Sequence, residues 1–405
     1  MEKTRKNADA AIIGTYLVPC REEYLISFEE LAASAAMGLV TRVESESKKR
    51  FHRRDFDGIF LSSATASAVI GKKGQLAWES IFASNFGIMS RMHAFSKGSE
   101  AINAAISAIR SNECEFVIVA GCDKRSDQQH TVDVSDKSID PNLRLWNWKW
   151  QNVYATLASK YLYETKTTHE DLITIAINDK YNATKTPKTL SQFKYLIENS
   201  DSRLYYDPLS FYDFASTKND GAAAILLTSV EKAQEYKNPI YIKASVSTTG
   251  PSEFWNQNNI FHYPALSRAA NIAYEKAQIT PKELDLVSVD TKVTIVGPLA
   301  LEGLEIFEYP ALPKISRKIK SLPDNYGEKH IVYENDMGGS FILNPCGSTY
   351  VYGNVPGVAG LSRLIQLVDQ LKGKSKNQVE NNPKIALLHE QSASGTKQMI
   401  HILER

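Results

Sequence analysis

The sequence has few cysteines, and they are widely scattered. Its 405 residues contain Cys20, Cys114, Cys122 and Cys346, and no two of them form a CxxC motif. This scatter predicts neither a disulfide framework nor a tetrathiolate zinc site, and it is typical of a protein in a reducing compartment. We therefore expect a cytoplasmic protein with no bound metal.

The sequence also has no excess of charge of one sign. Lys and Arg together number 47, Asp and Glu number 46, and the formal net charge is +1. No bulk electrostatic field therefore attracts nucleic acid or an anionic membrane, and we expect neither as a partner.

Long apolar runs are missing as well. No stretch approaches the roughly 20 apolar residues of a membrane span. The N-terminal segment MEKTRKNADAAIIG is basic, but the apolar run that follows is too short for the core of a secretory signal. The sequence thus predicts a soluble protein.

The composition is that of an ordinary globular protein, with 43% hydrophobic and 23% charged residues over a length that suits two or three domains. Short apolar runs alternate with segments of helical period, which indicates an α/β protein with buried strands. The expected strands cover 10–14, 58–61, 116–120, 222–227, 240–245, 284–289, 385–388 and 399–403. The expected helices cover 28–43, 97–110, 152–164, 169–183, 265–277 and 358–371, and polar loops are expected over 124–143, 185–210 and 372–384.

Two segments resemble each other and raise the question of an internal duplication. Residues 101–124 align without gaps on 269–292 with six identities in 24 positions, and each copy reads as an Ala-rich helix, a polar turn and an apolar strand. The match is either a coincidence between two αβ units or the trace of two similar α/β halves.

Four motifs, in order along the chain, resemble those of the thiolase family. HAFSKGSEAINAAISAIRSNECEFVIVAGCDKRSD (93–126) is similar to the family's nucleophile helix and the strand after it. YDFASTKNDGAAAILL (212–227) is similar to the strand that closes the first half. LNPCGSTYVYGNVPGVAGLSRLIQLVDQLKG (343–373) and LLHEQSASGTKQMIHIL (387–403) are similar to the GHP segment and the final hairpin of the archaeal and sterol-carrier-protein types. The resemblance covers residues 10 to 405.

This resemblance implies a thiolase fold, in which two similar α/β halves form a five-layer αβαβα core. The halves would span residues 1–235, with an inserted loop domain at about 125–210, and residues 236–405. The family consists of acetyl-CoA C-acyltransferases of lipid metabolism, so coenzyme A or an acyl-CoA is implied as substrate or ligand, with no covalently bound cofactor. Such proteins form homodimers or tetramers, and archaeal relatives associate with a zinc-ribbon/OB-fold protein and a hydroxymethylglutaryl-CoA synthase.

The family's nucleophile is replaced in this sequence. Thiolases carry the acyl group on a cysteine, because a thiolate is both a strong nucleophile and a good leaving group at neutral pH. The matching position is Phe95, three residues before Gly98, and none of the four cysteines takes its place. We expect the Phe95 ring either to occupy the acyl site or to fill the core at the start of the helix.

Other catalytic positions of the family differ too. The resemblance matches its HDCF motif, which contains an oxyanion-site histidine and an acid/base cysteine, to Asp290, Thr291, Lys292 and Val293. It matches the GHP histidine to Asn354, which donates a hydrogen bond but cannot act as a base, and only His389 keeps its family identity. The candidate catalytic positions are therefore Asp290, Lys292, Asn354 and His389. Alternatively, Asp290 and Lys292 form an ion pair in a solvated turn, and His389 is a buried structural histidine.

Three functions remain open at this point. The first is a thiolase-like pseudoenzyme that lacks Claisen condensation and acts as an acyl-CoA-binding or scaffolding subunit. The second is a thiolase-fold retro-aldolase, a reaction for which Tyr350, Tyr352 and the amine of Lys292 are candidates. The third is a conventional acetyl-CoA C-acyltransferase, which would require a different alignment at Phe95.

Overall fold

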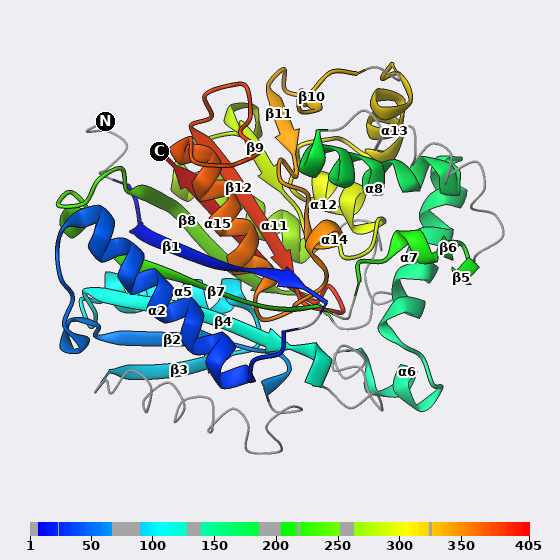
Figure 1. The fold of residues 1–405 in the computed structure, drawn as a ribbon. Helices are drawn as coiled ribbons and strands as arrows, with labels where there is room; N and C mark the ends of the chain where they lie inside the picture. The colour runs from blue at the N-terminus through cyan, green and yellow to red at the C-terminus, as the bar shows by residue number, and fades with distance from the viewer. Residues whose placement is uncertain are drawn as a thin grey trace.

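The structure, a computed structural model, describes residues 7–22, 24–66, 90–127, 139–185, 204–216, 219–251, 263–323 and 326–405 (Figure 1). The strands and helices expected from the sequence are all present in these ranges. None of the described helices is both long and apolar enough to cross a membrane.

Eleven strands of the described residues form one sheet, which divides into two parts of identical strand order. The first part has the order β3-β2-β4-β7-β1 and the second β11-β9-β12-β13-β8, with β10 outside β11. The first part comprises β1 (Ala10–Arg21), β2 (Gly58–Ser62), β3 (Arg91–Phe95), β4 (Phe116–Lys124) and β7 (Asp220–Thr228). The second comprises β8 (Ile240–Thr249), β9 (Leu286–Ser288), β10 (Val332–Glu334), β11 (Ser340–Leu343), β12 (Ile385–Gln391) and β13 (Lys397–Glu404).

Strand directions repeat as well. β2 is parallel to β3 and β4, just as β9 is parallel to β11 and β12. In each part the remaining two pairings are antiparallel, and the parts meet where β1 runs antiparallel to β8 at Ala10–Ile12. The expected duplication into two similar halves is therefore confirmed.

The alignment that suggested the duplication is wrong in detail. It pairs the helix before the fourth strand of the first half with the helix before the second strand of the second half. The equivalent of α5 (Gly98–Arg110) is instead α15 (Ala359–Lys372), and the equivalent of α2 (Phe28–Ser47) is α11 (Pro264–Ala277). Helices of one amphipathic type resemble each other, so the sequence match selected the wrong pair.

These helices complete a five-layer arrangement. Because side chains alternate along a strand, Ile118 of β4 packs with α2 on the outside, while Val117 and Val119 pack with α5 and α15. The α5 and α15 layer lies between the two sheet parts and contacts both. Helix α11 covers the other face of the second part, so the αβαβα fold class is confirmed.

The loop region lies to one side of the core in Figure 1. It contains α6 (Pro141–Leu145), α7 (Trp150–Thr165), α8 (His169–Thr184) and the short strands β5 (Leu204–Tyr206) and β6 (Leu209–Ser210). It packs through Trp150, Tyr154 and Tyr161 against α12 (Val296–Gly303) and α13 (Leu312–Lys320). The exact domain boundaries near 125, 210 and 235 remain predictions.

Candidate functional site

A cavity of about 230 Å³ lies where the two halves meet. Helix α5 and the end of β4 contribute to one side of it, and the loop after β9, the segment before α15 and the β12–β13 hairpin contribute to the other. Its walls are formed by Ala64, Thr65, Ser96, Lys97, Glu100 and Arg125 of the first half and by Thr249, Lys292, Asn354, Pro356, Ser392, Ala393, Thr396 and Lys397 of the second.

Asp123, at the end of β4, organises the floor of this cavity. Its buried Oδ1 accepts hydrogen bonds from the backbone N–H groups of Ala64 and Thr65, both at 2.9 Å, and from the hydroxyls of Ser63 and Thr65. Its Oδ2 accepts one from the backbone N–H of Gly357 at 2.6 Å. One carboxylate thus ties the loop after β2 to the turn before α15, and both segments line the cavity.

Lys292 reaches the cavity from the loop that follows β9. Its Nζ donates a hydrogen bond to the backbone oxygen of Ser392 at 2.6 Å and lies 3.9 Å from Oδ2 of Asp290. The Asp290 carboxylate also accepts from Thr349 at 2.8 Å. Both side chains are about 3% exposed, so the pair is buried, and the expectation of a solvated turn is wrong.

Burial controls the electrostatics of Lys292. Removal from water lowers the pKa of its ammonium to about 7; the Asp290 carboxylate partly opposes this shift and the neighbouring Lys97 ammonium adds to it. Burial pushes the pKa of Asp290 upward, but Lys292 and then Arg363 hold it well below its usual range. Near neutral pH the cavity therefore contains an ionised carboxylate beside an amine that is half deprotonated.

Asn354 lies on another wall of the same cavity. It follows Gly353, whose φ of +85° and close contact with Asn219 leave no room for a Cβ, which would lie 2.3 Å from the Asn219 side chain. The backbone N–H of Asn354 donates to Ser216 at 2.6 Å, which fixes the turn. Its side chain has no hydrogen-bond partner among the described residues, so the amide is available to a ligand.

Phe95 does not occupy the cavity. It ends β3 and stacks on Phe60, with ring centroids 6.1 Å apart, at the margin of the core between the sheets. The residues at the cavity wall are the next two, Ser96 and Lys97. The expectation that the Phe95 ring fills the acyl site is therefore wrong, and the alternative of a core-packing role fits its contacts.

None of the four cysteines lines the cavity. Burial raises the pKa of Cys20 to about 12, and it also raises the pKa of Cys114, Cys122 and Cys346. All four thiols stay protonated at neutral pH, so none provides the thiolate that thioester formation needs.

His389 lies beneath the site rather than in it. It is fully buried in β12, its Nε2 lies 2.8 Å from Oε1 of Gln398, and its Nδ1 has no partner among the described residues. Because the Gln398 oxygen only accepts, we assign the proton to Nε2. Burial lowers the pKa of His389 to about 4, which keeps the ring neutral.

Acid should destabilise the protein through this histidine and through His401, whose pKa burial lowers to about 3. An unfolded histidine titrates near 6.5, so between that pH and the folded pKa the unfolded chain binds more protons. The stability is fully present above pH ~6.5 and falls on acidification by up to about 1.4 kcal/mol per pH unit for each histidine. Urea unfolding between pH 7 and 4 measures this slope. We expect a shallower slope in His389→Gln, whereas equal slopes for the variant and the wild type would show that His389 is protonated in the folded state.

Sequence patterns did not reveal three further charged residues around the cavity. Lys97 lines it, and Glu390 accepts a hydrogen bond from the backbone N–H of Ser99 at 3.0 Å, at the N-terminus of α5. Arg363 of α15 donates to the backbone oxygen of His389 at 2.7 Å. Conversely, Tyr350 is buried with its hydroxyl on the backbone oxygen of Tyr212, and neither it nor Tyr352 lines the cavity. No group of metal-ligating side chains occurs within the described ranges.

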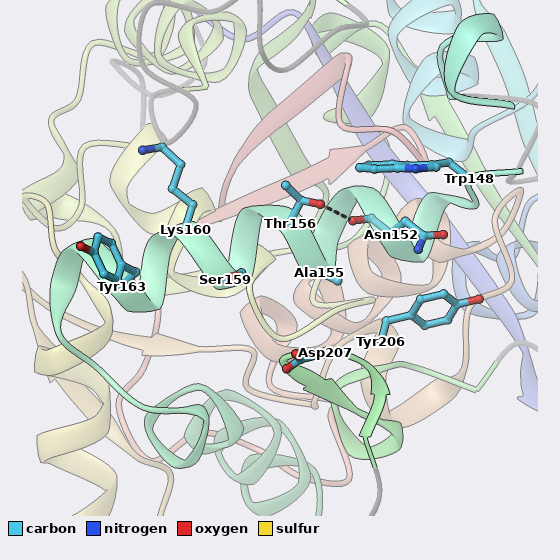
Figure 2. A pocket seen from close by; sticks show the side chains of 9 residues that line it. All are labelled: Trp148, Asn152, Ala155, Thr156, Ser159, Lys160, Tyr163, Tyr206 and Asp207. Atoms are coloured by element: carbon cyan, nitrogen blue, oxygen red, sulfur yellow. Dashed lines mark hydrogen bonds between the residues drawn. The ribbon is translucent and has the colours of Figure 1, made fainter. Parts of the chain in front are cut away.

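A second hollow of about 510 Å³ lies on the outer side of α7. Figure 2 shows Asn152, Thr156 and Lys160 along this helix, with Trp148 just before it in the chain and Tyr206 of β5 opposite. Among the described residues only Lys160 and Asp207 bring charge to this hollow, whereas five charged residues line the cavity between the halves, which we take as the functional site.

Comparison with known proteins supports the fold. No protein-family model matches the chain. It is 27% identical to an acetyl-CoA acetyltransferase of Methanothermobacter thermautotrophicus over 98% of this chain and 100% of that protein. It is 24% identical to sterol carrier protein 2 of Bos taurus over 81% of this chain and 62% of that protein.

Two solved structures have the same fold. An Ltp2-ChsH2(DUF35) aldolase superposes with a TM-score of 0.71 at 19% identity, covering 98% of this chain and 97% of that one. The Acat5 thiolase from Ascaris suum in complex with coenzyme A superposes with a TM-score of 0.67 at 13% identity, covering 98% and 100%.

The chain therefore has the thiolase fold. Its relatives by sequence include an acetyl-CoA acetyltransferase and sterol carrier protein 2.

Proposed function

We propose that this protein binds an acyl-CoA and acts on it without the thioester chemistry of thiolases, through aldol-type formation or cleavage of a carbon–carbon bond. The observation that carries the proposal is the cavity between the halves, which contains the buried amine of Lys292 and no thiol. Two solved proteins of this fold, one described as an aldolase and one as a thiolase in complex with coenzyme A, support the reaction class and the ligand.

Lys292 is the proposed acid/base group. In the addition direction its neutral amine removes a proton from the carbon next to the thioester carbonyl, which gives an enolate. The enolate carbon attacks the carbonyl carbon of an aldehyde or ketone, and the new alkoxide takes the proton back from the Lys292 ammonium. The reverse sequence breaks the same bond. A pKa of about 7 suits both roles, because each protonation state is populated near neutral pH.

Asn354 is the proposed partner of the enolate oxygen. The backbone at Asn354 is fixed by the Gly353 turn, and the side-chain amide has no hydrogen-bond partner among the described residues. A donor held in place before the reaction stabilises negative charge that develops on the thioester oxygen. Asp290 would keep Lys292 oriented, since its carboxylate is itself held by Thr349.

A second candidate function is that of an acyl-CoA-binding subunit that catalyses no reaction. One contact supports it. The Lys292 ammonium donates to the Ser392 backbone oxygen at 2.6 Å, so the lysine also fastens the β12–β13 hairpin. A purely structural lysine would give ligand binding, measurable as thermal stabilisation by acyl-CoA, without exchange of substrate protons.

Incubation with acetyl-CoA in deuterated water separates these functions. We expect deuterium to enter the acetyl methyl group, while intact-mass analysis shows no acetyl adduct on the protein. An acetyl adduct on a cysteine would restore the conventional acyltransferase and overturn the proposal. Binding without exchange would support the subunit that does not turn over.

A further inference from the structure

We propose that the acyl group bound in this cavity carries a carboxylate, which pairs with the ammonium of Lys97. The inference rests on the proposed acyl-CoA function and specifies its substrate class. It follows from the distribution of charge around the cavity between the halves.

The cavity has more cationic than anionic groups. Lys97, Arg125, Lys292 and Lys397 line it, and Glu100 is the one acidic residue among the described residues of its lining. The carboxylate of Glu100 accepts a hydrogen bond from Ser96 at 3.0 Å and forms an ion pair with Lys397, so these two charges offset each other. The negative charge of Asp290 likewise offsets the positive charge of Lys292. Of the other two cations, Arg125 has an interaction of its own, which leaves the charge of Lys97.

Lys97 is also buried, and it forms no direct ion pair with any described residue. The residue is 8% exposed, and its side chain has no hydrogen bond or ion pair among the described residues. Its charge nevertheless acts on the reacting groups, because it contributes to the lowered pKa of both Lys292 and Asp290. A buried ammonium with no partner is unfavourable, and a ligand carboxylate would relieve this cost with a charge-assisted hydrogen bond.

The size of the site restricts the ligand further. A volume of about 230 Å³ is below the usual range for a complete organic ligand, so the cavity suits a short acyl group while the rest of coenzyme A lies outside. Because Lys97 and Lys292 both line this small cavity, the carboxylate and the reacting carbon must be close in the ligand. A four-carbon dicarboxylic half-thioester, such as a succinyl group, meets both conditions.

Succinyl-CoA and butyryl-CoA make a matched pair of probes, since both acyl chains have four carbons and one ends in a carboxylate. Calorimetric titration of the full chain with each thioester measures the preference directly. We expect the wild type to bind succinyl-CoA about tenfold more tightly or better. Lys97→Gln should reduce the ratio of the two Kd values to about one.

Two variants test whether the effect belongs to the charge of Lys97. Lys97→Arg keeps the charge and should keep the preference. The double variant Glu100→Gln/Lys397→Gln removes a neighbouring ion pair without changing the net charge, and should keep it too. Equal binding of the two thioesters by the wild type, or an unchanged ratio in Lys97→Gln, would overturn the inference and leave the proposed function standing. Failure of the wild type to bind either thioester would instead overturn the proposed function.

Discussion

Replacing Lys292 with methionine is expected to slow deuterium exchange into acetyl-CoA by about 10²- to 10⁴-fold, the usual contribution of a positioned acid/base group. Methionine keeps the length and the packing of the side chain but removes the amine that takes the proton. The rate is measured by mass spectrometry of acetyl-CoA recovered from deuterated buffer, at saturating ligand.

Two further variants make this result specific. Lys292→Arg keeps a positive charge that does not deprotonate at neutral pH, so it should be as slow as Lys292→Met. Lys374→Met removes an exposed lysine that is paired with Glu46, and it should exchange at the wild-type rate. If Lys292→Met exchanges deuterium into acetyl-CoA at the wild-type rate, another group acts as the base.

Replacing Asp123 with alanine is expected to lower the free energy of unfolding by about 3–5 kcal/mol. The substitution leaves three backbone N–H groups, those of Ala64, Thr65 and Gly357, without their acceptor at a buried position. The loop and the turn that line the cavity would lose their common anchor. Urea denaturation at pH 7 measures the change.

A surface carboxylate provides the matched control for Asp123. Glu46 is 44% exposed and pairs with Arg42 and Lys374, so Glu46→Gln should cost less than about 1 kcal/mol. A similar small loss for Asp123→Ala would show that the cavity floor does not depend on this carboxylate.

The sequence predicted those elements whose residues follow a regular period. The buried strands and the long amphipathic helices are examples, because their apolar runs are continuous or recur on one face. β3 was missed because its five residues, RMHAF, contain no continuous apolar run. α12 was missed because the segment VGPLALEG is buried on every side and shows no periodic pattern.

The candidate site was predicted only where the family motifs cover it. Lys292 and Asn354 were found from motif positions and do line the cavity, whereas His389, found the same way, lies below it. Motif position gives a place along the chain but not the direction of a side chain. It therefore left open whether the Phe95 ring occupies the acyl site or packs in the core, and the core-packing role fits its contacts. Lys97 lies within the first family motif but matches none of the catalytic positions, and only its place in the folded cavity identifies it.

The pH dependence of deuterium exchange into acetyl-CoA tests the central claim, that an amine and not a thiolate acts in the cavity. The reaction needs neutral Lys292, whose pKa burial lowers to about 7. We predict a rate that rises with pH, levels off above an inflection near 7, and loses this inflection in Lys292→Met. A rate that shows no inflection near 7, or keeps it in Lys292→Met, would contradict the claim.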